Sequence, residues 1–218
     1  MQYKIIGEDM QTLDILLKKG DKFYANPGHF VSKDNSVDMS ARAVGGATGG
    51  LIRAFTGTGI FLAEFSANDD GNVSLAGIFP GKIMSFNLKE GEELLVEHFA
   101  YLASDTGNVE IQTVSLGAAF FGGAGLFLQK HKGPGSVFIH VIGRAIENDL
   151  DGTSEMQIEP GHIAAFQPSL SYNIKYVGNI RAAILGGAGL FFANFSGKGT
   201  VYCHSTSRFA LMAQSGRK

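Results

Sequence analysis

Six histidines are the side chains of this sequence best suited to chemistry near neutral pH, because imidazole titrates in that range and binds metals readily. They are spread along the chain, at His29, His98, His131, His140, His162 and His204. None belongs to an HxH, HExxH or CxxC pattern, the spacings that are typical of transition-metal sites. His140 and His204 each follow a glycine by five positions, whereas His29 and His162 each close a Pro-Gly-His triplet. Four of the six histidines therefore form two equivalent pairs rather than a recognisable ligand set.

These pairs of histidines have two interpretations. Equivalent side chains could meet around an axis as symmetric ligands, or the repeats could have inherited a histidine that hydrogen-bonds to the backbone. The second interpretation is favoured because Ala76 stands where the other segments have His140 and His204. We therefore expect no metal-binding residue and no tightly bound transition metal. Whether His140 and His204 form a site is left open by the sequence.

The nucleophile and the acid pairs of the sequence are not placed for catalysis. Cys203 is the one cysteine, so no intrachain disulfide forms, and we expect a buried thiol in a reducing compartment. Its neighbour His204 would point to the opposite face of a strand, so the two cannot act as a dyad. The acid pairs at residues 69–70 and 92–93 lie in turn-like contexts and are expected to be solvated. We predict no catalytic residue and no enzymatic activity.

Three glycine-rich stretches resemble phosphate-binding loops at first sight. They are TGTGIFLAEFS at residues 56–66, GGAGLFLQKHK at residues 122–132 and GGAGLFFANFS at residues 186–196. None has the Gly-Lys-Ser/Thr ending of a phosphate loop or the third glycine of a dinucleotide-binding loop, and each runs into strand-forming residues. We therefore expect no cofactor and no cofactor-binding residue.

The same stretches reveal an internal repeat that must position the histidines. Gly57, Gly123 and Gly187 recur at nearly constant steps, 123 − 57 = 66 and 187 − 123 = 64. A strand-like segment starts at Gly71, Gly135 and Gly199, where the steps are 135 − 71 = 64 and 199 − 135 = 64. The period predicts one compact body of three units, at about residues 1–78, 79–147 and 148–218. We expect the glycines of the repeated stretches to adopt conformations that penalise a Cβ.

Short strands are the elements that this sequence favours. Its 30 glycines punctuate short apolar runs, and residues 172–176 and 200–204 alternate between two faces. Residues 137–141 are almost continuously apolar, as in a strand buried on both faces. One short helix is possible, at residues 49–55. The sequence therefore predicts an all-β fold of antiparallel strands.

With these repeated "tGxGlFlaxFs" and "GxGxVxlxs" patterns and the Pro-Gly-His-Phe-Val-Ser segment at residues 27–32, the chain resembles the altered-inheritance-of-mitochondria (mitochondrial biogenesis) family over nearly its whole length. The resemblance implies tandemly repeated antiparallel β-sandwich units of the double-stranded β-helix type. It implies a fold like that of the tryptophan RNA-binding attenuation protein. The N-terminal segment at positions 1–20 contains no arginine, which favours a bacterial-type member and a cytoplasmic location over a mitochondrial one.

Charge and hydropathy exclude other classes of function. The net charge is −2, and the basic residues Arg144, Arg181 and Arg208 are scattered, so general nucleic-acid binding is not expected. No segment reaches the roughly 18 continuous apolar residues that would span a membrane as a helix.

The most consistent hypothesis is a non-enzymatic β scaffold that associates with itself and binds a partner protein or a membrane-proximal complex. The 17 phenylalanines and six tyrosines, together with a charged fraction of 17%, favour burial between copies, with a trimer expected and a dimer possible. One alternative is a small-molecule or RNA-binding module, and a second is an enzyme whose site has no recognisable motif.

Overall fold

Nearly every element of the structure is a β-strand. The computed structural model describes residues 2–43, 61–105, 109–114, 126–176 and 191–215. Within these ranges the strands pair antiparallel, and the helices are two single 3-10 turns and one short α-helix. The prediction of an all-β antiparallel fold is confirmed. The helix expected at residues 49–55 and the glycines of residues 57–59, 123–125 and 187–189 lie outside the described residues.

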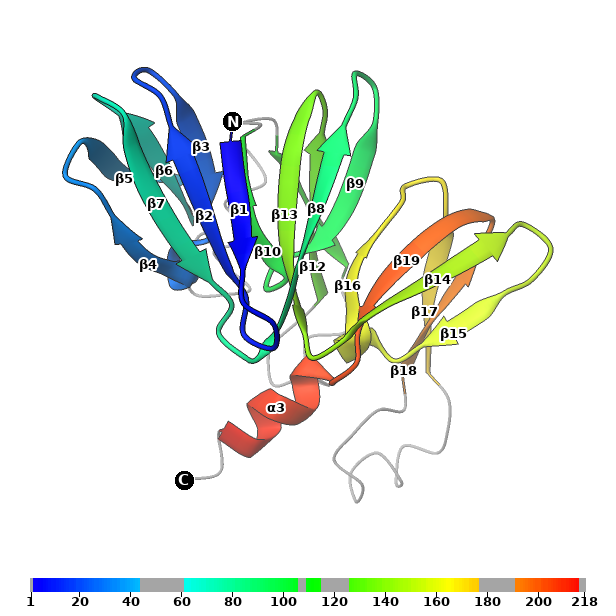
Figure 1. Cartoon of the computed structure of the whole chain (residues 1–218). Helices are drawn as coiled ribbons and strands as arrows, with labels where there is room; N and C mark the ends of the chain where they lie inside the picture. The colour runs from blue at the N-terminus through cyan, green and yellow to red at the C-terminus, as the bar shows by residue number, and fades with distance from the viewer. Residues whose placement is uncertain (1, 44–60, 106–108, 115–125, 177–190, 216–218) are drawn as a thin grey trace.

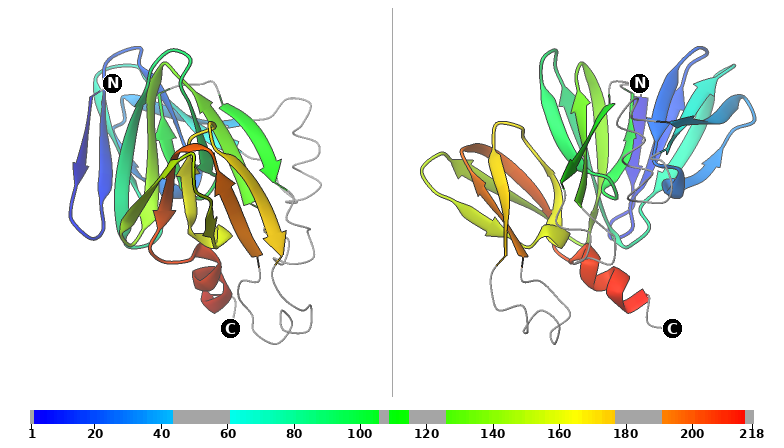
Figure 2. Two further views of the ribbon diagram at one scale, coloured as in Figure 1. Left: turned by 90° about the vertical axis from the view of Figure 1, so that its right-hand side faces the viewer. Right: turned by 180° about the vertical axis from the view of Figure 1, so that it is seen from behind.

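The strands form three consecutive groups that lie side by side as a fan (Figures 1 and 2). The first group holds β1 (Gln2–Ile6), β2 (Thr12–Leu17), β3 (Lys22–Ala25), β4 (Phe30–Lys33), β5 (Val37–Ala43), β6 (Phe61–Ala67) and β7 (Gly71–Ala76). The second holds β8 (Gly81–Leu88), β9 (Glu93–Glu97), β10 (Tyr101–Ser104), β11 (Val109–Val114), β12 (Leu126–Lys132) and β13 (Gly135–Ile142). The third holds β14 (Ala145–Asp151), β15 (Met156–Ile158), β16 (Ile163–Phe166), β17 (Ser171–Tyr176), β18 (Phe191–Ser196) and β19 (Lys198–His204).

Two of the four sheets cross from one strand group to the next. In the described residues the sheet orders are β1-β2-β7-β4, β5-β6-β3-β10-β13-β8, β11-β12-β9-β16-β19-β14 and β15-β18-β17. Strand β3 of the first group pairs with β10 of the second, and β9 of the second pairs with β16 of the third. These two pairings, β3–β10 and β9–β16, make continuous sheets out of neighbouring groups and are here called the joints.

The strand groups use the same strand order. Strands β2, β7 and β4 of the first group are neighbours in that order. The equivalent strands are β8, β13 and β10 in the second group and β14, β19 and β16 in the third. One hydrogen bond recurs at the same place in each: Asp34 Oδ2 accepts from the backbone of Asn72, Asp105 Oδ1 from Ser136, and Gln167 Oε1 from Thr200.

Of the two boundaries predicted between the repeated units, one lies between two strand groups and the other lies inside a strand. The first, at residues 78 and 79, lies in the turn between β7 and β8. The second, at residues 147 and 148, falls inside β14, which by its sheet position opens the third group. The division into three repeated units stays a prediction.

The strand predictions from hydropathy hold in the described residues. Residues 172–176 lie in β17, and residues 200–204 lie in β19. Residues 137–141 lie in β13, and the side chains of these five residues are all buried, as the continuous apolar run indicates.

Apolar side chains from all three strand groups meet in a shared central core. Phe23 and Phe65 stack within the first group at 4.6 Å between ring centroids, and Phe166 and Phe195 pack edge to face in the third. Between them, one cluster joins residues from every group: Leu62, Leu94, Val96, Ala100, Tyr101, Val137, Ile139, Val141, Ala164 and Ala165. Because this cluster crosses both sheet joints, the groups are held together by apolar burial as well as by backbone pairing.

Two single-turn helices and one α-helix gather at one end of the fan. η1 (Pro27–His29) and η2 (Pro160–His162) are capped by Asn26 and Glu159, whose side chains accept from the glycine of each Pro-Gly-His triplet. The helix α3 (Arg208–Ser215) lies below the strands in Figure 1 and contacts η2. None of the helices in the described part of the chain is long and apolar enough to cross a membrane.

Candidate functional site

A cavity of about 300 Å³ lies between the helix α3 and the ends of the strand groups that are lowest in Figure 1. Its lining, here called the histidine cavity, consists of His29, Ile78, Phe79, Phe99, His140, Ile142, His204, Arg208 and Met212. The three histidines come from η1, from β13 and from the end of β19, one from each strand group. The tertiary structure thus brings together histidines that the sequence placed in two separate pairs.

Backbone hydrogen bonds decide which nitrogen of two of these neutral rings carries the hydrogen. His29 Nδ1 donates to the carbonyl of Ala76 at 2.8 Å, so in the neutral ring Nε2 carries a lone pair. His204 Nδ1 accepts from the backbone N–H of Ile142 at 3.0 Å, so its Nε2 carries the hydrogen. Both Nε2 atoms are buried without a hydrogen-bond partner in the described structure. The cavity therefore offers one free acceptor and one free donor.

The third histidine of the cavity is also tied to the backbone. His140 is 3% exposed and hydrogen-bonds to the backbone of Phe79. Its ring centroid lies 6.3 Å from that of His29. His140 and His204 both hydrogen-bond to the backbone, His204 to a different strand group, and both also face a common cavity.

Burial keeps the three rings uncharged at neutral pH. Desolvation lowers the pKa of His140 to about 4 and that of His204 to about 3, with like-charge repulsion from neighbouring groups adding to both. The pKa of His29 is lowered by the same loss of solvent.

A buried ion pair closes one wall of the histidine cavity. Arg208 Nη2 lies 3.3 Å from Glu97 Oε1, with 4% and 0% of the two side chains exposed. Glu97 Oε2 accepts from the backbone N–H groups of Phe99 and Ala100. Desolvation raises the pKa of Glu97, whereas Arg208 and these N–H groups oppose the rise. With the pair ionised, the two charges cancel and the wall carries no net charge.

Arg208, the first residue of α3, is held by stacking as well as by charge. The guanidinium carbon lies 4.5 Å from the ring centroid of Phe99 and 4.5 Å from that of Phe209. Arg208 Nη1 donates to Met212 Sδ at 3.5 Å, and Met212 is 41% exposed. The cavity is thus covered by a helix whose outer turn reaches solvent.

The donor set of the histidine cavity does not fit a metal ion. His204 Nε2 carries a hydrogen for as long as Nδ1 accepts from Ile142, so it has no lone pair for a cation. Within the residues that the structure describes, no three His, Cys, Asp or Glu side chains are grouped to bind a metal. Hydrogen bonding to an uncharged molecule is the chemistry that the arrangement supports.

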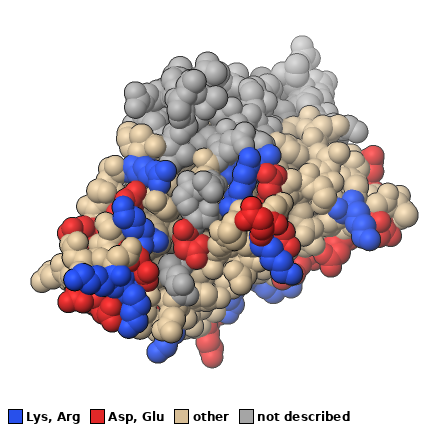
Figure 3. Space-filling view, turned by 90° about the horizontal axis from the view of Figure 1, so that it is seen from above, with Lys and Arg blue, Asp and Glu red and all other residues tan. Residues whose placement is uncertain are grey.

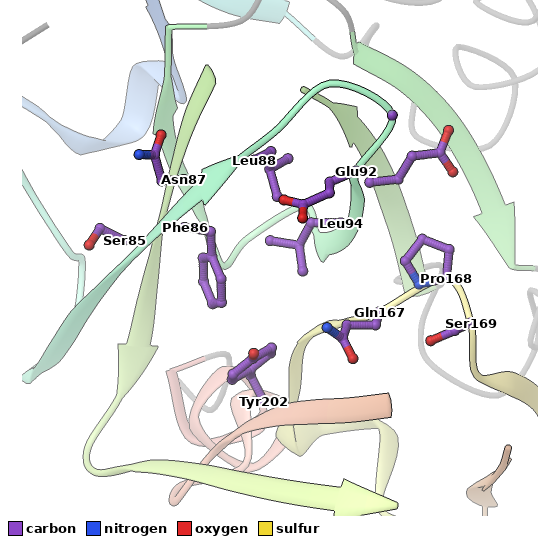
Figure 4. Close-up of a pocket in the computed structure, with 12 residues that line it drawn as sticks. Ser85, Phe86, Asn87, Leu88, Glu92, Leu94, Gln167, Pro168, Ser169 and Tyr202 are labelled. Carbon is purple, nitrogen blue, oxygen red and sulfur yellow. The ribbon is translucent and has the colours of Figure 1, made fainter. Parts of the chain in front are cut away.

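A second, more open cleft of about 580 Å³ lies between the second and third strand groups. Figure 4 shows Leu88, Leu94 and Phe86 on one side of it and Gln167, Pro168 and Tyr202 on the other. The rings of Phe86 and Tyr202 meet edge to face at 4.8 Å between centroids. This cleft marks the groove beside the β9–β16 joint.

The polar side chains around the open cleft already serve the fold. Glu92 Oε2 accepts from the backbone of Lys89, and Gln167 Oε1 accepts from that of Thr200. Glu93 forms ion pairs with Lys130 at 3.4 Å and Lys132 at 3.7 Å. The acid pair at residues 92–93 therefore stabilises a turn and neighbouring strands.

Asp70 and Cys203, which the sequence also offered as reactive groups, lie where the fold explains them. Asp70 pairs with Lys18 at 2.7 Å on the surface, where its side chain is 57% exposed, as expected for a solvated acid. Cys203 is buried, as predicted, and desolvation raises its pKa to about 11. A thiol with such a pKa is a poor nucleophile at neutral pH.

His98 and His131 lie in a buried polar chain behind the histidine cavity. Gln129 Nε2 donates to His98 Nδ1 at 2.8 Å, and His131 Nε2 donates to Gln129 Oε1 at 3.2 Å. The ring of His131 stacks on Tyr101 at 4.8 Å between centroids. Desolvation lowers the pKa of His98 to about 4 and that of His131 to about 3, so both rings are neutral near pH 7.

Acidic and basic side chains are interspersed on the face seen in Figure 3. They form no continuous basic surface there, which agrees with the net charge of −2.

Sequence reasoning missed Glu97 and Arg208. Glu97 has the capping position that Asn26 and Glu159 occupy in the other groups: the backbone N–H three positions later bonds to the cap carbonyl in all three. A comparison of these turns could have singled out Glu97. Arg208 gave no signal, because its partners Glu97 and Phe99 belong to a different strand group and lie far from it in the sequence.

Comparison with known proteins gives a consistent set of relatives. The sequence profile described as "Mitochondrial biogenesis AIM24" matches residues 3–206. An uncharacterised protein of Streptococcus pyogenes serotype M6 is 28% identical over 211 residues, which is 92% of this chain and 84% of that protein. A crystal structure of a Streptococcus pyogenes protein superposes with a TM-score of 0.79 at 23% identity, over 99% of this chain and 98% of that one. The last comparison shows the fold alone.

Proposed function

Since the chain belongs to the mitochondrial biogenesis AIM24 family, to which the match over residues 3–206 assigns it, we propose that it is a non-enzymatic β scaffold that assembles head to tail with other copies of itself. The carrying observation is the exposure of Val31. This side chain is 55% exposed on β4, whereas Leu102 on β10 and Ala164 on β16 are 0% exposed.

The three residues occupy the same position in their strand groups. Val31 follows Pro-Gly-His by two positions, as Ala164 does, and Leu102 follows the corresponding turn of the second group. Strands β10 and β16 are buried because each pairs with a strand of the preceding group, β3 or β9. Strand β4 pairs with β7 along one edge, and in the described residues no strand pairs with its other edge, the one that β10 and β16 use in the other groups.

The complementary edge lies at the other end of the fan. Strand β15 ends its sheet, and it has the position that β3 and β9 have in the two internal joints. A second copy could therefore add its β4 to β15 of the first with the register of those joints. Extrapolated from Ala103 opposite Ala25 and Ala165 opposite Val96, this register places Ser32 opposite Ile158 and Lys33 opposite Gln157.

Head-to-tail pairing occupies the β4 edge and the β15 edge of every chain only when it closes into a ring. A trimer is the expected ring. It would bury the exposed apolar residues Phe30 and Val31 and leave no β4 or β15 edge open to aggregation.

Cross-linking tests this interface directly. The variant with Lys33→Cys and Gln157→Cys should form a ladder of covalent oligomers on mild oxidation, because each cysteine meets the other in a neighbouring copy. Lys33→Cys alone and Gln157→Cys alone are the matched controls and should form no ladder. Sedimentation equilibrium of the unmodified protein should give about three times the chain mass of 23.2 kDa. A single species of 23.2 kDa would refute self-association.

The proposal includes a partner protein or membrane-proximal complex bound by the assembled scaffold, and it assigns no reaction to the chain. Two observations support the proposal that the chain catalyses no reaction. The acids at residues 92–93 are engaged in capping and ion pairs, and the pKa of Cys203 is raised. A partner that requires assembly should be recovered with the unmodified protein and lost with a variant whose β4 edge is blocked.

The same proposal assigns the units to the double-stranded β-helix type, as in the tryptophan RNA-binding attenuation protein. Support comes from the face-to-face strand sets β2-β7-β4 and β5-β6-β3, which recur in the same order in each strand group. Superposition of single groups on that protein tests the assignment.

A further inference from the structure

We propose that the histidine cavity is a binding site for a small uncharged molecule with an apolar body and one polar group that both donates and accepts a hydrogen bond, of which an alcohol or phenol is the simplest.

The shape and lining of the cavity indicate the apolar body. Its volume of about 300 Å³ is at the lower end of the range for small-molecule sites. Most of the lining is apolar, from Ile78, Phe79, Phe99, Ile142 and Met212. Binding of an apolar molecule to such a lining is favourable, because the molecule displaces poorly bonded water.

Two unpartnered nitrogen atoms indicate the polar group. His29 Nε2 is an acceptor and His204 Nε2 is a donor, because the other nitrogen of each ring is committed to the backbone. Both residues are deeply buried, at 2% and 1% exposure, and both Nε2 atoms lack a partner in the described structure. A buried polar atom that is left unpaired destabilises a protein, so a ligand that satisfies both atoms would be favoured.

The charge balance of the walls excludes an ion as the preferred ligand. The charge of Arg208 is neutralised by Glu97 at 3.3 Å, and the imidazoles are uncharged at neutral pH. A carboxylate or ammonium ligand would enter without a free countercharge, and its desolvation would not be offset.

The helix α3 provides the entrance. Met212 lines the cavity and is 41% exposed, so it lies between the site and solvent. Ala210 is exposed on the same helix and does not line the cavity. Substitution at these two positions therefore separates a block of the entrance from a general effect of bulk on α3.

Calorimetric titration at pH 7.5 with p-cresol, toluene and benzoate tests the proposal. Toluene lacks the hydroxyl of p-cresol, and benzoate is charged. We expect p-cresol to bind at one site per chain, at least about tenfold more tightly than toluene, and benzoate not to bind. Met212→Trp should weaken p-cresol binding at least about tenfold, and Ala210→Trp should leave it unchanged.

A second pair of variants tests the role of the free nitrogen atoms. His29→Phe should remove most of the preference for p-cresol over toluene. His162→Phe is its control, because His162 Nδ1 makes the equivalent backbone bond, to His204, outside the cavity lining. Equal affinity for p-cresol and toluene in the unmodified protein, tight binding of benzoate, no saturable binding of p-cresol, or binding that Met212→Trp leaves intact would each overturn the proposal.

Discussion

Glu97 Oε1 and Arg208 Nη2 lie 3.3 Å apart in a wall of the histidine cavity, where the two side chains are 0% and 4% exposed. The first residue ends a strand of the middle group, and the second begins the helix near the end of the chain. This pair therefore attaches α3 over the cavity. Because an ion is strongly destabilised when its partner is removed from a dry site, the attachment is sensitive to single substitutions.

Replacing Arg208 should destabilise the protein strongly. Arg208→Met leaves Glu97 buried without its countercharge, and we expect a loss of about 3–5 kcal/mol in the free energy of unfolding, measured with urea. The double variant Glu97→Gln with Arg208→Met should recover part of this loss. Lys18→Met, which breaks the exposed pair with Asp70, is the control and should change stability little. A similar small change for Arg208→Met would mean that the ion pair does not hold α3.

Gly77→Ala should disturb His140. A Cβ at Gly77 would clash with His140 Nε2, and the ring is buried, so it has little room to move. We expect a loss of about 1–3 kcal/mol in urea denaturation, the usual scale for overpacking a core. Gly28→Ala is the matched control, because the nearest atom to its Cβ would be at 3.6 Å. Equal midpoints for the two variants would contradict the predicted contact.

Val31→Lys should dissociate the proposed assembly. A lysine at the centre of β4 would place a charge where the internal joints bury Leu102 and Ala164. Sedimentation equilibrium should shift toward the chain mass of 23.2 kDa, while the circular dichroism spectrum stays unchanged. Met10→Lys adds the same charge at a residue that is 66% exposed outside β4 and β15, and it should leave the assembly intact. An unchanged assembly in Val31→Lys would place the interface elsewhere.

Stability should fall as the pH drops below about 6.5. Burial lowers the pKa of His98 and His140 to about 4 and that of His131 and His204 to about 3, so the unfolded chain binds protons there first. Each ring can contribute up to about 2 kcal/mol of destabilisation between pH 6.5 and pH 5.

The raised pKa of Glu97 acts in the opposite direction, since the folded protein takes up that proton at higher pH than the unfolded chain. Thermal melts from pH 8 to pH 4.5 measure the sum of these effects. A melting temperature that stays constant over this range would show that the histidines are not buried in neutral form.

The protein purified without a histidine tag should contain no stoichiometric transition metal. His204 Nδ1 accepts from Ile142, which leaves a hydrogen rather than a lone pair on Nε2. Elemental analysis for zinc, iron and manganese measures this. Near-stoichiometric metal that is lost when His140 and His204 are both changed to Ala would show that the backbone bonds do not exclude a metal.

The local pattern of the sequence was sufficient to predict the strands and the family. The alternation at residues 172–176 and the apolar run at residues 137–141 depend only on which face of a strand is buried, and β17 and β13 follow. The same periodic glycines pointed to the family that the profile over residues 3–206 confirms.

The cavity and the joints were decided only by the tertiary structure. Val31 and Leu102 stand at equivalent places, yet one is 55% exposed and the other fully buried, because only β10 has a neighbouring strand across the joint. His29, His140 and His204 converge although each belongs to a different strand group and lies far from the others in the sequence. Hydropathy and spacing report how each residue lies within its own element. The free nitrogens and the Glu97–Arg208 pair arise where elements distant in sequence pack together, and such long-range contacts leave no periodic signal in the chain.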